Sequence, residues 1–213
     1  MQIVILLYDR FTALDAIGPY EVLSRLPGAT VVFAAGQPGL VRADTGMLAL
    51  HADAALGDVP HPDIVVIPGG PGQREQMGGG GVHDWLRAAD AASSWTTSVC
   101  TGSLILAAAG LLAGRRATTH WLAMDDLRAL GVTAVSERVV IDGKFITAAG
   151  VSAGIDMALG LAGRIGGAGL AQAIQLGIEY DPQPPYAAGS PAVAPPDLVA
   201  SMRARSQRAT ARG

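Results

Sequence analysis

The chain has 213 residues, which is the size of one ordinary domain. Half of its residues are hydrophobic and 15% are charged, and this balance excludes a globally disordered chain. A net charge of −3 excludes the strongly basic character of many nucleic-acid-binding proteins, and a single cysteine excludes an intrachain disulfide and a multi-cysteine zinc site.

The apolar segments are short. The first, at residues 3–7, has no basic residue before it and is too short for the apolar part of a secretion signal. No segment approaches the roughly 20 apolar residues that a membrane-spanning helix needs. A lone thiol suits a reducing compartment. We therefore expect a cytoplasmic protein that has neither a membrane nor a nucleic acid as its partner.

Apolar runs and helical patterns alternate along the first half of the chain. The run at 3–8 is rich in branched apolar residues without polar alternation, which is typical of a strand buried on both faces of a parallel sheet. The elements expected here are a strand at 3–8, a helix at 15–26, strands at 30–35 and 63–67, a helix at 83–92, a strand at 96–99 and a helix at 103–112.

The second half continues this alternation. Asp142-Gly143 is a strong hairpin turn signal between two short apolar runs. The elements expected here are a helix at 123–130, hairpin strands at 138–141 and 144–147, helices at 152–165 and 170–179, a Pro-rich connection at 181–196 and an exposed helix at 197–208. The arginines of the tail, Arg203, Arg205, Arg208 and Arg212, are interpreted as a solvated helix face or a frayed end.

Strands that alternate with helices predict an α/β fold, with a mostly parallel open sheet and helices on both faces, in a single domain over residues 1–213. In such folds, ligands bind beyond the carboxyl ends of the strands. Three informative segments follow predicted strands: Leu14-Asp15, the glycines after Pro68, and Cys100-Thr101-Gly102. We expect these segments to converge.

Cys100 lies between a predicted strand and a helix that begins one or two residues later. This arrangement is typical of a nucleophile elbow, built here around cysteine, in which Gly102 permits the sharp turn. The N–H groups and dipole of the following helix are expected to stabilise a thiolate. The alternative is that Cys100 is a small buried apolar residue, which is the commoner fate of a free cysteine.

Asp15, Gly69, Gly70 and His120 each have two interpretations. Asp15 is either a helix N-cap or a carboxyl that faces the thiol as an acid or base, with its pKa raised by burial. Gly69 and Gly70 form a tight turn and also permit backbone amides to approach a developing negative charge. His120 is either a structural histidine or a hydrogen-bond donor to substrate. The other histidines are scattered, and we expect no metal site.

These residues resemble the DJ-1/PfpI superfamily over nearly the whole chain. Within it, the pattern is most similar to the isocyanide hydratase group. The segments that carry the resemblance are Leu14-Asp15 with Gly18-Pro19, Ile67-Pro68-Gly69-Gly70, Ser98 to Leu104 (SVCTGSL), Gly110-Leu111-Leu112, Arg116 to Trp121 (RATTHW), Glu137 to Val140, Ala153 to Asp156, and Glu179-Tyr180 followed by Pro182, Pro184 and Pro185.

The resemblance implies a flavodoxin-like sandwich, a homodimer with sites near the interface, and a reaction without a cofactor. That reaction is the hydration of a small-molecule isocyanide to an N-substituted formamide. The nucleophilic cysteine of the group corresponds to Cys100, its acidic partner to Asp15, and the threonine after the nucleophile to Thr101. We expect Gly69, Gly70 and His120 to contact the substrate.

Other members of the superfamily provide the alternatives. Thr101 stands where protease-like members have histidine, which disfavours a peptidase. Asp15 replaces the glutamate of glyoxalase- and DJ-1-like members, which favours the hydratase. The segment after Asp181 is short and Pro-rich, so we expect no C-terminal DNA-binding domain. A glyoxalase- or deglycase-type enzyme, a cysteine redox sensor and a metabolite-binding domain without catalysis remain open.

Overall fold

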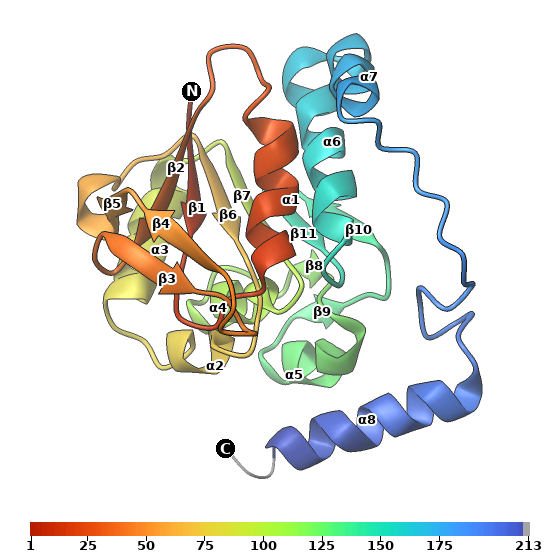
Figure 1. The fold of residues 1–213 in the computed structure, drawn as a ribbon. Coiled ribbons are helices and arrows are strands. Elements are labelled where there is room, and N and C mark those ends of the chain that lie inside the picture. The colour runs from red at the N-terminus through yellow and green to blue at the C-terminus, as the bar shows by residue number, and fades with distance from the viewer. Residues whose placement is uncertain (211–213) are drawn as a thin grey trace. The chain divides into compact units, whose positions relative to one another are not determined.

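The computed structural model describes residues 1–210 (Figure 1), so Arg212 of the predicted solvated tail lies outside the described residues. The chain divides into two compact units, residues 1–178 and 179–213, and each is described by itself. The single domain expected over residues 1–213 stays a prediction.

The core of the first unit is a seven-stranded sheet in the order β10-β11-β7-β6-β1-β2-β5. All neighbouring pairs are parallel except the β10–β11 hairpin at one edge. Two of the central strands, β1 and β6, are almost continuously apolar and buried, which is what a sheet covered on both faces requires. The strands of this sheet are β1 (Gln2–Leu6), β2 (Thr30–Ala35), β5 (Ala54–Ala55), β6 (Ile64–Ile67), β7 (Trp95–Val99), β10 (Val139–Asp142) and β11 (Phe145–Ala148).

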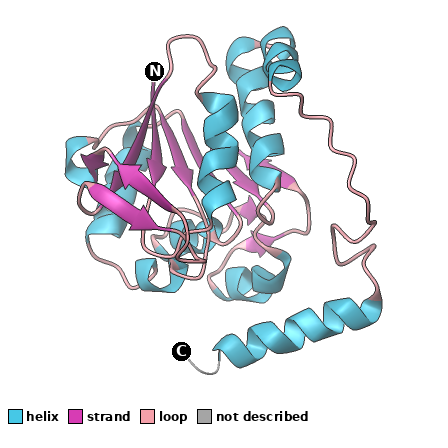
Figure 2. Cartoon of the chain, in the orientation of Figure 1, coloured by secondary structure: helices cyan, strands magenta, loops and turns pink. Residues whose placement is uncertain are grey.

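Helices cover both faces of this sheet (Figures 1 and 2), which confirms the predicted α/β fold. Strand order steps one way from β1 to β2 and the other way from β6 to β7, so right-handed crossovers place the connecting helices on opposite faces. Helices α1 and α6 pack together on one face, and α3 and α4 lie on the other. The helices of the first unit are α1 (Ala13–Leu23), α2 (Gln73–Gln76), α3 (Gly81–Ala92), α4 (Gly102–Ala108), α5 (Met124–Ala129), α6 (Ala153–Gly166) and α7 (Ala168–Gly177), with 3-10 turns at η1 (Leu56–Asp58) and η2 (Trp121–Ala123).

Two predicted boundaries differ from the structure for local reasons. The helix expected at 103–112 ends at Ala108, because Gly110 adopts a φ of 85° that no α-helix accommodates. The hairpin is confirmed but shifted by one residue: Asp142 pairs with Phe145, so the loop is Gly143-Lys144. Gly143 supplies the positive φ of this loop, while the Asp142 carboxylate accepts a hydrogen bond from the Arg116 amide.

The sequence analysis predicted no element between residues 36 and 62. The structure has an antiparallel hairpin there, β3 (Gly39–Arg42) with β4 (Ala49–Ala52), as well as β5 and η1. It also has two short paired strands, β8 (Arg116–Ala117) and β9 (Thr133–Ala134). These strands have two to four residues each, which is too few to produce a periodic hydrophobic signal.

The second unit contains an irregular segment and a helix. Residues 181–195 form turns without a regular element, and α8 (Pro196–Thr210) follows, as expected for the Pro-rich connection and the exposed helix. The Arg205 and Arg208 side chains are exposed. Among residues 1–210, no helix is both long and apolar enough to cross a membrane.

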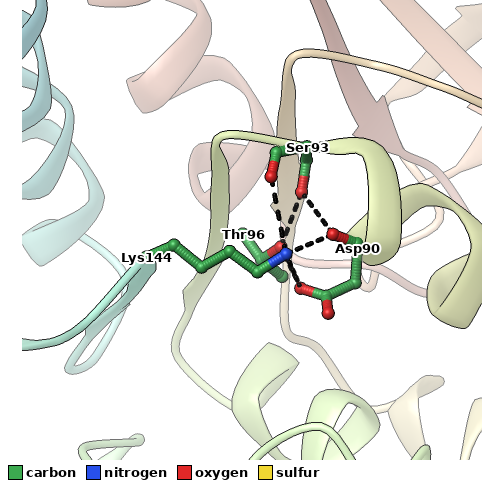
Figure 3. A network of polar contacts seen from close by, with 4 residues as sticks. All are labelled: Asp90, Ser93, Thr96 and Lys144. Atoms are coloured by element: carbon green, nitrogen blue, oxygen red, sulfur yellow. Dashed lines mark hydrogen bonds and ion pairs between the residues drawn. The ribbon is translucent and has the colours of Figure 1, made fainter.

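A polar cluster lies where β7 begins (Figure 3). The Lys144 ammonium contacts the Asp90 carboxylate at 3.0 Å and donates to the backbone carbonyls of Asp90 and Ser93. The Thr96 hydroxyl donates to the same carboxylate at 2.6 Å and contacts the Ser93 hydroxyl. Lys144 thus joins the hairpin loop to the C-terminal end of α3, where a cation meets unpaired carbonyls and the negative end of the helix dipole.

We expect Lys144→Met to lower the free energy of unfolding by about 1–3 kcal/mol, because it leaves a mostly buried carboxylate and helix-end carbonyls without their cation. Urea unfolding measures the loss. Arg128→Met is the matched control, since its ion pair with Asp125 is exposed and is expected to contribute less than about 1 kcal/mol. Equal losses in the two variants would contradict the stabilising role of Lys144.

Candidate active site

Three chain segments meet at the carboxyl ends of β1, β6 and β7. They carry Asp15 in the first turn of α1, Gly69 and Gly70 after β6, and Cys100 and Thr101 after β7. Backbone contacts join the segments, since the Gly69 carbonyl accepts from the Thr12 amide at 2.8 Å. The convergence expected at the strand ends is therefore present.

Cys100 occupies a strained elbow between β7 and α4. Its φ is 56°, which is unfavourable for a residue with a side chain and has to be held by its surroundings. The Cys100 amide donates to the carbonyls of Ala148 and Ala149, and its carbonyl accepts from the Thr119 hydroxyl at 3.0 Å. Both backbone polar groups of the strained residue are thus anchored from the neighbouring strand β11 and from the segment before η2.

Two glycines permit the elbow to pack against the end of β6. A Cβ atom on Gly102 would collide with the Ile67 carbonyl oxygen, and one on Gly69 would lie 2.5 Å from the Thr101 amide nitrogen. Because backbone meets backbone at both positions, no side-chain movement relieves the clash. Gly102 is therefore needed for this close packing, whereas the positive φ of the sharp turn belongs to Cys100.

Asp15 is fully buried and is not the N-cap of its helix, because α1 begins at Ala13 with Thr12 at the cap. Its Oδ2 atom accepts a hydrogen bond from the Gly69 amide at 2.9 Å, and Oδ1 is buried without a well-aligned partner among residues 1–210. Burial raises the pKa of Asp15 from 3.8 to about 7. Hydrogen bonds from the Gly69 amide and the Cys100 thiol oppose this rise, and the charge of Asp44 adds to it.

The thiol of Cys100 is only 6% exposed. Burial, and then the negative charge of Asp15, raises its pKa to about 12, although Val151 and Thr101 oppose the rise with hydrogen bonds to the sulfur. Desolvation and the charge of Asp15 thus oppose the stabilisation of a thiolate that is expected at the elbow, whereas the hydrogen bonds from Thr101 and Val151 favour it. Between these two pKa values, Asp15 and Cys100 together hold one proton.

Thr101 connects Cys100 to the glycine turn. Its Oγ1 atom accepts a hydrogen bond from the Gly70 amide at 3.0 Å. That bond occupies the hydroxyl as an acceptor, and the hydroxyl in turn lowers the pKa of Cys100 by hydrogen bonding to the sulfur. The Gly69 and Gly70 amides thus already have acceptors, in Asp15 and Thr101, instead of being free to meet a developing charge. A substrate contact by either glycine stays a prediction.

His120 belongs to a different part of the site. Its Nδ1 atom accepts a hydrogen bond from the Leu122 amide, so it caps η2, and its ring lies against Gly150. Burial lowers its pKa, so the ring is neutral at pH 7. Its neighbour Thr119 holds the Cys100 carbonyl, whereas the His120 ring itself packs beside the loop that follows β11. A substrate contact by His120 stays a prediction.

The structure adds three residues that the sequence analysis did not assign to the site. Tyr8, after β1, donates to the Pro68 carbonyl, and its pKa is raised by burial and by the charges of Asp15 and Cys100. Asp44 enters from the β3–β4 hairpin and accepts from the Thr12 hydroxyl at 2.9 Å. Val151 contributes a backbone amide to the sulfur. Only Tyr8 had a signal in the sequence, because it lies at the end of a predicted strand.

This arrangement is suited to adding the Cys100 thiol to an electrophile, while the neighbouring Asp15 carboxyl accepts or donates a proton. Within the described range 1–210, no group of three or more His, Cys, Asp or Glu side chains is placed to hold a metal ion.

Comparisons with known proteins agree on one family. The DJ-1/PfpI family pattern matches residues 1–163. The chain is 43% identical to an isonitrile hydratase of Pseudomonas putida, covering 97% of this chain and 90% of that protein. It is 36% identical to the HTH-type transcriptional regulator CdhR of Pseudomonas aeruginosa, covering 74% of this chain and 47% of the regulator. A crystal structure of a THiJ/PfpI family protein from Pseudomonas syringae matches with a TM-score of 0.94 and 35% identity, covering 97% of this chain and 86% of that chain.

We expect Asp15→Asn to stabilise the protein above pH 7. The folded chain holds the Asp15 proton up to about pH 7, whereas an unfolded carboxyl loses it near 3.8, so the free energy of unfolding falls as pH rises between these values. Asparagine keeps an acceptor for the Gly69 amide and has no charge to bury. The gain is expected to reach about 2–4 kcal/mol at pH 8 and to vanish near pH 4.

Urea unfolding at pH 4, 6 and 8 measures this difference. Asp126→Asn on the exposed surface of α5 is the control and is expected to change little at any pH. A gain for Asp15→Asn that is the same at all three pH values would show that burial of the charge is not its cause.

Proposed function

This chain belongs to the DJ-1/PfpI family, and we propose that it is an isonitrile hydratase, which adds water to an isonitrile (isocyanide), R–N≡C, and releases a formamide, R–NH–CHO. The observation that carries the proposal is the buried pair of Asp15 and Cys100 in a chain that is 43% identical over nearly its whole length to an isonitrile hydratase. The catalytic role of each residue is part of this proposal.

The first step adds the Cys100 S–H bond across the terminal carbon of the isonitrile. This carbon carries a lone pair, so it has to gain a proton as well as a nucleophile. Asp15 takes the proton from the thiol and delivers it to the carbon, while the sulfur forms the new C–S bond. The product is a thioimidate, R–N=CH–S–Cys, and the proton that the pair retains near pH 7 is the one transferred.

The second step adds water to the same carbon. Asp15, now a carboxylate, removes a proton from the water and passes it to the imine nitrogen, while the hydroxide adds to the carbon. The tetrahedral adduct R–NH–CH(OH)–S–Cys then collapses: the C–S bond breaks, the hydroxyl proton passes to Asp15 and the formamide is released. Asp15 returns that proton to the sulfur, which restores the starting pair. No electron is transferred in either step, so the proposed reaction requires no redox cofactor.

Two amides support the sulfur in this scheme. The Thr101 and Val151 amides and the Thr101 hydroxyl form hydrogen bonds that favour the anionic form of the Cys100 sulfur. They matter most when the C–S bond forms or breaks, because the sulfur carries negative charge at those moments. In the resting pair they are insufficient to ionise the thiol, which limits its side reactions.

The environment of Cys100 disfavours the redox-sensor alternative. Peroxide reacts with thiolates that are accessible to solvent, whereas this thiol is 6% exposed and its pKa is raised to about 12. The glyoxalase or deglycase alternative uses the same cysteine on a carbonyl compound. Turnover of methylglyoxal without turnover of any isonitrile would favour it.

We also propose that the enzyme acts as a homodimer on a small-molecule substrate, as the family resemblance implies, and in the cytoplasm, where reducing conditions keep Cys100 free. Sedimentation equilibrium of the purified chain tests the dimer, since a monomer at micromolar concentration would contradict it.

The test of the proposed function is turnover of para-nitrophenyl isocyanide, with the formamide identified by mass spectrometry. We expect Cys100→Ala, Cys100→Ser and Asp15→Asn to reduce kcat/KM to the background rate, because each removes the nucleophile or the group that moves its proton. Asp126→Asn is expected to retain wild-type activity. An active Cys100→Ser variant would contradict the covalent mechanism, and an inactive wild-type enzyme with a reduced thiol would contradict the function.

The pH profile tests the shared proton. Because Asp15 has to be a carboxylate to accept the thiol proton, we expect kcat/KM to rise with pH through about 7, where Asp15 ionises. Asp44→Asn removes a like charge that raises the pKa of Asp15, so this variant is expected to move the rising limb to lower pH. A limb that stays in place or moves to higher pH would contradict this influence of Asp44.

A further inference from the structure

One peptide group in the site is hydrogen bonded at both ends. The Tyr8 hydroxyl donates to the Pro68 carbonyl oxygen at 2.8 Å, and the Gly69 amide donates to Asp15 Oδ2 at 2.9 Å. The Pro68 carbonyl and the Gly69 N–H belong to the same peptide unit. The phenol, the peptide and the carboxyl therefore form one continuous chain of hydrogen bonds.

This series of hydrogen bonds runs through the interior of the protein. Tyr8 is 5% exposed and Asp15 is 0% exposed, and the Pro68–Gly69 peptide between them is buried. Hydrogen bonds in series polarise one another, and they do so most strongly where water does not screen them. A donor at the carbonyl end of a peptide draws electron density away from its N–H, which makes that N–H a stronger donor at the other end.

The phenol is suited to be a permanent donor. Burial and the charges of Asp15 and Cys100 raise the pKa of Tyr8 well above 10, so the hydroxyl keeps its proton whenever Asp15 is ionised. The next peptide is also held on both sides, because the Gly69 carbonyl accepts from the Thr12 amide at 2.8 Å and the Gly70 amide donates to the Thr101 hydroxyl at 3.0 Å. The donor, the peptide plane and the acceptor are thus fixed together.

We propose that Tyr8 is a positioning residue for Asp15, which acts through the Pro68–Gly69 peptide to orient its N–H and to stabilise the Asp15 carboxylate. The other titratable groups that act on Asp15 are the Cys100 thiol and the carboxylate of Asp44. The Gly69 amide lowers the pKa of Asp15, whereas burial and the charge of Asp44 raise it. Tyr8 strengthens the effect of the amide. Its contribution to catalysis rests on the proposed function, whereas its effect on the ionisation of Asp15 does not.

The direct test is a titration of Asp15 by carbon-13 NMR, in protein labelled at the aspartate carboxyl carbons, with the Asp15 signal assigned by its loss in Asp15→Asn. We expect Tyr8→Phe to raise the titration midpoint of Asp15 by about half a pH unit or more, because the weakened amide stabilises the carboxylate less. Tyr20→Phe, on the surface of α1, is the matched control and is expected to leave the midpoint unchanged. An unchanged or lowered midpoint in Tyr8→Phe would overturn the proposal.

A second measurement does not require removal of the hydroxyl. Replacing all tyrosines by 3-fluorotyrosine makes each phenol a stronger donor, and we expect the Asp15 midpoint to fall in the wild-type background. The same labelling in Tyr8→Phe is expected to have no such effect. A fall of equal size in both backgrounds would assign it to another tyrosine and overturn the proposal.

Kinetics separate this proposal from the proposed function. In Tyr8→Phe the rising limb of kcat/KM is expected to move to higher pH by the same amount as the NMR midpoint, with KM little changed. A shifted midpoint with an unshifted limb would overturn the catalytic role of Tyr8. If the wild-type enzyme hydrates no isonitrile, the proposed function fails, yet the NMR midpoints still decide whether Tyr8 acts on Asp15.

Discussion

The site depends on one constraint: a carboxyl and a thiol share a buried space in which they cannot both be ionised. Burial raises the pKa of Asp15 and of Cys100, and the charge of Asp15 raises the pKa of Cys100 further, while the hydrogen bond from the thiol lowers the pKa of Asp15. The pair therefore retains a proton under conditions in which isolated groups in water would already have lost one. A reaction that must place both sulfur and hydrogen on one carbon can draw both from this pair.

The backbone around Asp15 and Cys100 permits these two side chains to lie close together. Parallel strands end at the same edge of the sheet, which brings the segments after β1, β6 and β7 together. Gly69 and Gly102 permit contact between backbones that any side chain would prevent. Cys100 adopts a strained φ because its amide and its carbonyl are both held by hydrogen bonds from other segments. A residue held in this way has little backbone freedom left.

The two ends of the central strands have different roles. The amino end of β7 is joined to α3 and to the β10–β11 hairpin by the polar cluster of Lys144, in which the mostly buried carboxylate of Asp90 is paired. At the carboxyl end, Asp15 has no counter-ion among residues 1–210 and lowers the stability of the folded chain wherever it is ionised. The continuous apolar burial of the central strands offsets this cost, as is common for sites that trade stability for reactivity.

The sequence by itself determined the fold class, most of the large elements and the residues at the strand ends, because apolar runs and their spacing are local properties of the chain. It also predicted that the segments carrying Asp15, Cys100 and Thr101 converge, because the carboxyl ends of parallel strands lie at one edge of the sheet, but not that Asp15 reaches the thiol. It missed the β3–β4 hairpin, whose strands are too short to show a period. Only the tertiary structure decided that Asp44 comes near Asp15, that the Gly69 and Gly70 amides bind protein groups, and that burial raises the pKa of the thiol. All three findings depend on the burial of individual groups and on contacts between segments that are far apart in the sequence. A sequence pattern specifies neither the burial nor the contacts.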